Sequence, residues 1–341
     1  MGAATTASTK KTAGRKRAAA ERNSASSVNW NLRRARGLQI LEAPALARLD
    51  WLVHGFSTRP GGASELKTPR EGRDVSEKVL NKVLKNVLNL GFTDWDSRER
   101  VLANRDKFFR GIGAARMRVV ALRQIHSDIV HIVNAEGQAR SDGASPSKPA
   151  LQGDALITRE RGVLLVVQTA DCIPILLADT KRRAVAAIHS GWRGTARRIA
   201  AKTLGRMQME FGTQPEDVVA ALGPGIGQPC YEVGTEVAAE FQAQFPNARE
   251  WFDGPFDRLA DSDNDPNWLP WLTMKPPGHQ PPPPHVQLDL IAANRAILAE
   301  AGIGSAKIFA SGHCTACRSD LFFSYRKERT TGRLMAAIGI R

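Results

Sequence analysis

The sequence lacks an apolar segment long enough to cross a membrane. Its most apolar stretch, residues 163–178, is interrupted by polar or ring-constrained residues: Gln168, Thr169, Asp171 and Pro174. A spanning helix needs about 20 consecutive apolar residues, so this stretch predicts two buried strands instead. The first residues also lack the apolar core of a secretory signal peptide. We therefore expect a cytoplasmic protein that does not associate with membranes.

Cysteine is scarce as well. The chain of 341 residues has four cysteines, too few for the disulfide framework of a small secreted protein. Cys314 and Cys317 form one Cys-x-x-Cys pair, but a zinc ribbon needs a second pair, which the sequence does not contain. This spacing predicts two packed thiols rather than a metal site, in a reducing compartment.

Acidic residues are few near the N-terminus, where much of the net charge of +14 arises. Residues 1–37 hold nine basic residues and one acidic residue, a net of +8. They have few large apolar side chains and cannot bury enough surface to fold. We expect a disordered tail before a single large domain, residues 38–341. A transit peptide and a polyanion-binding arm stay open, but the body shows no basic helix with interleaved aromatic residues that would indicate nucleic acid.

The spacing of apolar residues predicts a chain of mixed helices and strands. Helices are expected over residues 75–88, 97–109, 195–211, 235–245 and 288–301. Strands are expected over residues 51–57, 119–122, 130–133, 154–158, 163–169, 173–179, 184–189, 218–222, 306–310, 322–326 and 333–340. Residues 247–285, which are aromatic, acidic and then proline-rich, are expected to form a surface excursion outside the core.

One predicted hairpin brings two metal-ligating residue types together. Its strands cover residues 173–179 and 184–189. With a symmetric turn of even length, His189 faces Pro174, and Cys172 lies diagonally across from His189 on the same face, about 7–8 Å away at Cα. One metal ion can bridge such a pair. A buried thiol beside a core histidine is the alternative interpretation.

Short motifs from His54 to Ile340 resemble a known family. In chain order they are His54-Gly55-Phe56, Thr58-Arg59, Gly61-Gly62, Asn89-Leu90-Gly91, Gln124-Ile125-His126, Asp154-Ala155-Leu156, Thr169-Ala170-Asp171-Cys172, His189-Ser190-Gly191-Trp192-Arg193-Gly194, Gly223-Pro224, Cys230-Tyr231-Glu232-Val233, Phe323-Ser324-Tyr325-Arg326 and Thr331-Gly332-Arg333. So many ordered matches make the sequence similar to the YfiH-like family, long described as polyphenol-oxidising laccases.

The resemblance implies a fold, a metal and an activity. The implied fold is α+β, a four-layer α/β/β/α sandwich of two mixed sheets, with residues 64–88 and 247–285 as insertions. The implied metal is Zn²⁺, with Cu²⁺ as an alternative, bound by His126, Cys172 and His189. The implied reaction is phosphorolysis of adenosine, inosine or methylthioadenosine, with adenosine deamination alongside. Purine nucleosides and phosphate are then the partners, and editing of peptidoglycan precursors is the alternative role.

Four more residues are candidates for the same site. Arginine binds phosphate with a bidentate fork, so Arg59 and Arg193 are candidates for phosphate and Asn89 for the sugar or base. Asp171 precedes Cys172 and is a candidate proton carrier or ligand-orienting group. The two arginines and Asp171 have structural alternatives: a surface arginine, or a turn aspartate bonded to backbone.

Two rival activities use the same residues. Multicopper laccases need many histidines, typically in His-x-His pairs, and the seven histidines here include no such pair. A single copper stays open, because two histidines and a cysteine also describe blue-copper ligands. A metal-free hydrolase would instead use a Cys172–His189 dyad, and metal content distinguishes it from a metalloenzyme.

Overall fold

Two six-stranded sheets form the centre of the computed structural model, which describes residues 30–68, 82–134, 151–254 and 285–341. In spatial order the first sheet contains β1 (Asn31–Ala35), β2 (Leu38–Glu42), β3 (Leu52–Ser57), β17 (Leu334–Ile340), β9 (Val163–Thr169) and β6 (Arg118–Val120). The second contains β16 (Ile308–Ala310), β12 (Val218–Leu222), β10 (Ile173–Asp179), β11 (Ala184–Ser190), β8 (Ala155–Thr158) and β7 (Val130–Ile132). Each sheet has parallel and antiparallel neighbours, which confirms the α+β class.

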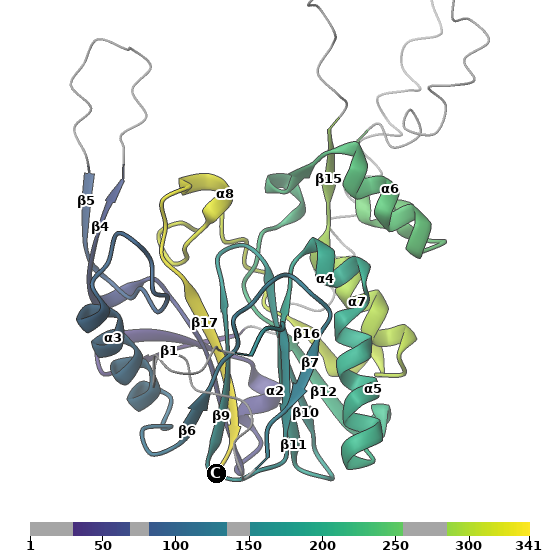
Figure 1. The fold of residues 1–341 in the computed structure, drawn as a ribbon, viewed down its shortest axis with the longest axis horizontal. Helices are drawn as coiled ribbons and strands as arrows, with labels where there is room; N and C mark the ends of the chain where they lie inside the picture. Colours follow the sequence, from purple (N-terminus) through teal and green to yellow (C-terminus); the bar gives the residue numbers. More distant parts are fainter. Residues whose placement is uncertain (1–29, 69–81, 135–150, 255–284) are drawn as a thin grey trace, which may run out of the picture.

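Helix α3 (Arg98–Gly111) packs on the outer side of the first sheet, and α4 (Trp192–Ala196), α5 (Ile199–Phe211), α6 (Thr235–Gln244) and α7 (Leu290–Glu300) pack beside the outer side of the second (Figure 1). The short helix α2 (Pro44–Ala47) contributes Leu46 to the core between the sheets, and α8 (Tyr325–Glu328) lies at the top edge in Figure 1. Two small sheets complete the β-structure of the described residues: β4 (Pro60–Thr68) with β5 (Lys82–Val87), and β15 (Val286–Leu288) between β13 (Glu232–Val233) and β14 (Phe252–Asp253).

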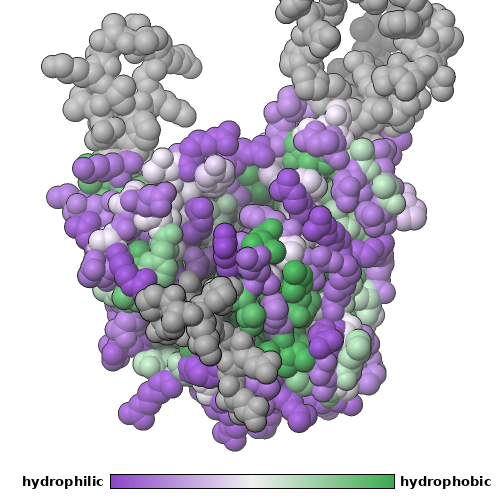
Figure 2. All heavy atoms as spheres, in the orientation of Figure 1, coloured by the Kyte–Doolittle hydropathy of each residue, from purple (hydrophilic) through white to green (hydrophobic). Residues whose placement is uncertain are grey.

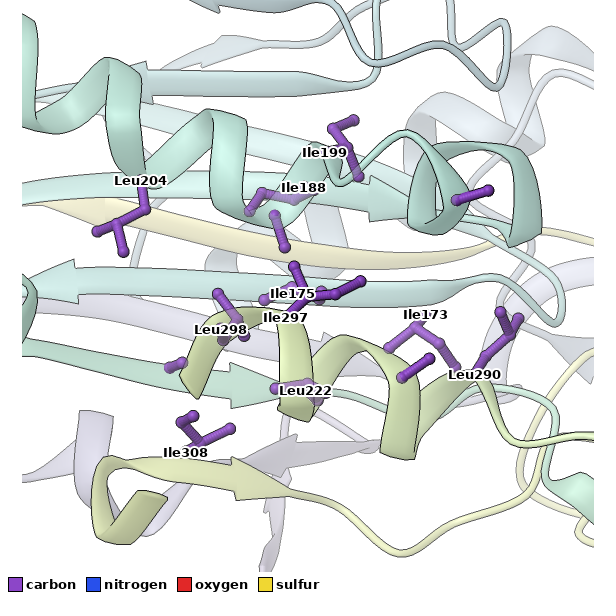
Figure 3. Close-up of a cluster of buried hydrophobic side chains, with 14 of the residues drawn as sticks. Ile173, Ile175, Ile188, Ile199, Leu204, Leu222, Leu290, Ile297, Leu298 and Ile308 are labelled. Carbon is purple, nitrogen blue, oxygen red and sulfur yellow. The ribbon is translucent and has the colours of Figure 1, made fainter. Parts of the chain in front are cut away.

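The core lies on both faces of each large sheet. Between the sheets, Leu165 of β9 packs in one cluster with Leu176 of β10. On the outer face of the second sheet, Ile175 of β10 belongs to a cluster with side chains of α5 and α7 (Figure 3). On the outer face of the first sheet, Leu164 of β9 packs with Phe108 of α3. Because successive side chains of a strand alternate in direction, burial on both faces explains why β9 and β10 are apolar runs.

No helix in the described ranges combines the length and apolar content needed to cross a bilayer. Hydrophilic residues cover most of the face in Figure 2, and hydrophobic residues gather in one area near its centre.

The helix predicted over residues 75–88 is wrong where the structure describes it. Residues 82–87 form β5, which pairs antiparallel with β4, and residues 75–81 lie outside the described part. Val87 is buried in a cluster with Leu66 of β4, and Leu84 packs against that cluster. An apolar repeat of this kind fits a helix locally, but pairing with a strand distant in sequence decides the conformation.

The predicted tail boundary at residue 37 is also wrong. Residues 31–35 form β1, paired with β2, and Arg33 donates a hydrogen bond to Glu42 at 2.8 Å. Trp30 is 9% exposed, and its ring centroid lies 5.1 Å from that of Phe56 in β3. The ordered domain therefore includes residue 30, and residues 1–29 lie outside the described part.

Trp30→Ala is expected to lower the free energy of unfolding by about 3 kcal/mol, because it removes a large buried ring. Urea denaturation followed by circular dichroism would measure the change. Removal of residues 1–29 is the control, since it keeps Trp30 and is expected to leave the midpoint nearly unchanged. An unaltered midpoint in Trp30→Ala would show that this ring does not stabilise the domain.

The excursion predicted over residues 247–285 is wrong at its N-terminal end, whereas His285 at the other end is exposed. Trp251 and Phe252 are buried, and the ring centroid of Trp251 lies 4.9 Å from that of Phe245 in a T-shaped arrangement. The aromatic residues that suggested a surface segment instead form a cluster against α6, while residues 255–284 lie outside the described part.

Two further predictions need correction. Residues 322–326 are not a strand: Phe322 and Phe323 are buried in a loop, and α8 begins after Ser324, whose hydroxyl accepts a hydrogen bond from the Lys327 amide. The helix predicted over residues 195–211 is divided into α4 and α5, because Arg198 adopts a left-handed conformation with φ of 59°. Neither feature changes the sheet order.

Candidate metal centre

The chain crosses between the two large sheets at two neighbouring places. One crossing joins β6 to β7 and contains His126, and the other joins β9 to β10 and contains Asp171 and Cys172. His126 and Asp171 have φ of 58° and 102°, so both crossings turn sharply. His189 lies near the end of β11, which leads into α4 (Figure 1). Three potential metal ligands therefore come from three separate segments.

The register of the β10–β11 hairpin is the predicted one: Pro174 lies opposite His189, so Cys172 lies diagonally across from His189. The ligand atoms of His126, Cys172 and His189 all lie within 4.8 Å of one another, and Cys172 Sγ is 3.8 Å from His126 Nε2. Bonds of 2.0–2.3 Å to a tetrahedral ion place its ligand atoms about 3.3–3.8 Å apart. The three donors are thus close to the spacing that a single ion requires.

Asp154 fixes the orientation of both histidine segments. Its side chain is fully buried, and its Oδ1 lies 2.8 Å from His189 Nδ1. The same carboxylate accepts hydrogen bonds from the backbone amides of His126 and Ser127, at 3.0 and 2.6 Å. A proton held on Nδ1 leaves Nε2 of His189 as the ligand atom, which is the usual arrangement of a carboxylate behind a metal-binding histidine.

Sequence reasoning missed the role of Asp154. The signal was present, because Asp154-Ala155-Leu156 is one of the motifs that carry the family resemblance. Its distance from His189 in the sequence concealed the contact, which β8 creates by pairing with β11.

The electrostatics of the centre favour a deprotonated thiol. Burial raises the pKa of Cys172, but the charge of His189 and a hydrogen bond from His126 outweigh it, so the net shift is downward. Burial lowers the pKa of His189, but the Cys172 thiolate and Asp154 outweigh it and raise the pKa. A thiolate, not a thiol, is the form of cysteine that binds metals and acts as a nucleophile.

The centre is buried on one side and open on the other. His189 is 4% exposed, Cys172 is partly exposed and His126 is exposed. Three protein ligands beside an accessible fourth position are typical of catalytic zinc sites, whereas structural sites are closed by four. The donor types and their spacing fit Zn²⁺, and they also fit copper.

Residues 53–341 match the family described as multi-copper polyphenol oxidoreductase laccase. The chain belongs to this laccase family. The YfiH-like resemblance seen in the motifs is thereby confirmed. In the described part of this laccase-family chain, the metal-compatible groups are His126–Cys172–His189 and a second group made of three cysteines.

Relatives of this chain are named as purine nucleoside phosphorylase or adenosine deaminase and not as laccases. It is 34% identical to a purine nucleoside phosphorylase of Deinococcus radiodurans over 307 residues, 90% of this chain and 94% of that protein. It is 34% identical to adenosine deaminase RL5 of an unknown prokaryotic organism over 233 residues, 68% of this chain and 78% of that protein. The crystal structure of YlmD from Geobacillus stearothermophilus superimposes with a TM-score of 0.68 at 32% identity, covering 91% and 98% of the two chains.

Gly191 of the family motif packs directly against the ligands. A Cβ at this position would lie 2.9 Å from Cys172 Sγ and 3.1 Å from His126 Cδ2. The backbone itself would accept alanine, because φ of Gly191 is −81°. The close approach of the ligands is therefore what requires glycine here.

Gly191→Ala is expected to weaken metal binding about 10- to 100-fold, as loss of ligand orientation does at other metal sites. Competition with a chromophoric chelator would measure the affinity. Gly205→Ala in α5 is the matched control, because its Cβ would meet nothing closer than 4.0 Å. Equal affinities of the two variants would show that the glycine is not needed by the centre.

Arg59 and Asn89 lie within buried networks. Arg59 Nη1 donates to Glu328 at 2.6 Å and to the Ser319 carbonyl at 2.9 Å, while its buried Nη2 has no partner among the described residues. Asn89 is fully buried, and its Oδ1 accepts a hydrogen bond from the Arg333 amide at 2.9 Å. The contacts of both residues lead to the segment that contains α8.

Asp171 and Arg193 have different environments. Both carboxylate oxygens of Asp171 are used, by the Thr315 hydroxyl at 2.7 Å and the Arg326 amide at 2.6 Å. This matches the structural alternative of a turn aspartate with a backbone bond. Arg193 is exposed, and its guanidinium carbon lies 4.5 Å from the centroid of the Trp192 ring.

Tyr231 and Arg326 were not singled out from the sequence, although both lie in family motifs. The Arg326 guanidinium carbon lies 5.1 Å from the centroid of the Tyr231 ring. Burial and the charge of Cys172 raise the pKa of Tyr231. Arg326 and Arg193 lower it by less, so the net shift is upward. The tyrosine is thus within electrostatic reach of the thiolate and of two positive charges.

Proposed function

We propose that this chain is a metal-dependent purine nucleoside phosphorylase with adenosine deaminase activity. The observation that carries the proposal is the open His126–Cys172–His189 group, oriented from behind by Asp154. The relatives named purine nucleoside phosphorylase and adenosine deaminase support this reaction class. Adenosine, inosine or methylthioadenosine would be the nucleosides, and Zn²⁺ the ion.

The ion and the residues around it have separate roles in the proposed reaction. When bound, the ion supplies Lewis-acid activation of water or substrate. Asp154 keeps a proton on His189 Nδ1 and thereby aims Nε2 at the centre. The buried side of the centre, at His189, keeps bulk water away, and substrate approaches from the side of His126.

Positive charge near the centre would bind phosphate. Arg193 is exposed, and Arg326 lies against Tyr231, so each guanidinium would donate a bidentate pair of hydrogen bonds to phosphate. Arg59 pairs with Glu328 of α8, and Asn89 binds the Arg333 amide. We therefore assign Arg59 and Asn89 to holding the segment that presents Arg326. Asp171, which accepts a hydrogen bond from the Arg326 amide, belongs to the same support.

Arg193→Ala is expected to slow phosphorolysis about ten- to a hundredfold while leaving deamination largely intact. A lost charged hydrogen bond to phosphate costs roughly 1.5–3 kcal/mol, and deamination needs no phosphate. Chromatography of adenosine reactions, with and without phosphate, would separate adenine from inosine. Arg197→Ala, four residues further on and also exposed, is the control and is expected to change neither product.

Two results would contradict this assignment. Equal losses of adenine and inosine in Arg193→Ala would show that the arginine does not serve phosphate. Absence of turnover of every purine nucleoside by zinc-loaded native protein would reject phosphorolysis. The peptidoglycan-precursor alternative could then be tested with a serine-bearing nucleotide–muramic acid substrate.

A metal-free cysteine hydrolase is the second candidate, favoured because Cys172 Sγ lies within 4.8 Å of a ring nitrogen of His189, whose charge lowers the pKa of the thiol. Such an enzyme keeps its activity after treatment with a chelator and loses it on alkylation of Cys172. The proposed phosphorylase loses its activity with the chelator and regains it with Zn²⁺.

A further inference from the structure

Three of the four cysteines gather away from the His126–Cys172–His189 group. Cys314 and Cys317 belong to one turn, and Cys230 ends the short 3₁₀ helix Gln228–Cys230. The three Sγ atoms lie within 4.8 Å of one another, and Cys230 Sγ is 3.4 Å from Cys317 Sγ. The Cys-x-x-Cys pair, which alone predicts packed thiols, thus has a third thiol from a segment distant in the sequence.

We propose that Cys230, Cys314 and Cys317 bind a second, thiophilic metal ion, Zn²⁺ or Cu⁺, that is separate from the catalytic centre. Thiolates select these ions over Mg²⁺ or Ca²⁺, which prefer oxygen ligands. Zinc–sulfur bonds of about 2.3 Å separate two sulfurs on a tetrahedral ion by about 3.8 Å. The observed spacing lies near that value.

The local backbone supports thiolate ligands at this place. The Gly227 amide donates a hydrogen bond to Cys314 Sγ at 3.1 Å, a contact that stabilises negative charge on sulfur. The Gly225 carbonyl accepts from the Thr315 amide at 2.9 Å, so the two segments that supply the thiols are joined by backbone hydrogen bonds. The cysteines are therefore held together by the fold before any ion binds.

A disulfide fits the geometry less well. A disulfide joins two sulfurs at about 2.05 Å, and it would leave one of the three thiols over. An ion uses all three, and the exposure of Cys317 leaves a route by which the ion can enter. Three sulfurs without imidazole also make this group softer than the catalytic centre, so Cu⁺ would favour it.

The second ion would also support the catalytic centre. Thr315 lies between the two cysteines of the turn, and its hydroxyl donates to Asp171, the neighbour of Cys172. The Asp171 carbonyl accepts from the Ile226 amide at 2.8 Å, within the glycine-rich segment before Cys230. An ion that fixes both segments would therefore fix the turn that carries Cys172.

Metal analysis of the purified full-length chain tests the proposal. The protein is loaded with Zn²⁺ under reducing conditions, desalted, and its zinc content measured by mass spectrometry. We expect about two ions in the native protein, and about one in Cys317→Ser, which removes an exposed ligand. His189→Ala is expected to keep the ion of the three cysteines, and the double variant to bind almost none. Asp320→Asn, an exposed change in the same turn, is the control and should keep two.

A second measurement leaves the three cysteines of the proposed site unchanged. In Cys172→Ala, the remaining three thiols should react slowly with a thiol reagent when Zn²⁺ or Cu⁺ is present, and quickly after a chelator is added. Comparison of the two ions shows which one protects the thiols more strongly. Equal zinc content of the native protein and Cys317→Ser, or thiols that react equally fast with and without metal, would overturn the proposal. A Cys230–Cys317 disulfide in metal-loaded protein, seen as an intact mass lower by two hydrogens, would also overturn it.

Discussion

His189→Ala is expected to abolish metal binding at the catalytic centre and, with it, both phosphorolysis and deamination. The substitution removes one of three ligands, so the loss of affinity and rate should exceed about 100-fold, the upper range for changes that only disturb ligand orientation. It also leaves the buried Asp154 carboxylate without its imidazole partner, which costs stability.

His189→Gln separates these two effects, because its amide can still donate to Asp154. We expect this variant to be more stable than His189→Ala in thermal unfolding, and equally inactive. Zinc content and initial rates with adenosine and phosphate would be measured side by side. Full phosphorolysis by either variant would remove the metal from the mechanism and leave phosphate binding as a separate feature.

Asp154→Asn is expected to weaken metal binding about 10- to 100-fold and to lower the free energy of unfolding by about 3 kcal/mol. The carboxylate accepts hydrogen bonds from three backbone amides and one hydroxyl, and it faces His189. An amide has one acceptor oxygen in place of two, so some of these donors lose their partner in a fully buried place.

Asp179→Asn is the matched control for this variant. Asp179 is also fully buried in the second sheet, where its Oδ1 accepts from the Lys181 and Arg182 amides at 2.9 Å. Asparagine keeps the one oxygen that accepts these bonds, so Asp179→Asn should lose less stability than Asp154→Asn and keep its metal affinity. If both variants bound metal as tightly as the native protein, Asp154 would be a structural residue and not an organiser of the centre.

The parts of the fold that depend on local pattern were predictable. The apolar runs gave β9 and β10, and the symmetric turn gave the register that places Cys172 diagonal to His189. What could not be predicted was that β9 and β10 belong to different sheets. That crossing depends on packing between the sheets and on the left-handed conformation of Asp171, which residue spacing does not reveal.

The errors have a common physical origin in contacts between distant residues. β5 is a strand because it pairs with β4, and Trp30 is ordered because it packs on Phe56. In the site, Asp154 reaches His189 through strand pairing, and Cys230 meets the Cys-x-x-Cys turn across 84 residues. A single sequence shows that residues with suitable side chains are present, but it does not show which of them are in contact in the fold.

The central claim is that the His126–Cys172–His189 group binds the ion on which purine nucleoside phosphorolysis depends. The most direct measurement is a titration of Zn²⁺ into metal-stripped Cys317→Ser, with adenosine and phosphate as substrates. This variant lacks one ligand of the proposed three-cysteine site, so that site should not take up the added zinc. We expect the rate of adenine and ribose 1-phosphate formation to rise with bound zinc and to saturate at about one ion per chain. Full activity of the stripped protein before any zinc is added would contradict the claim.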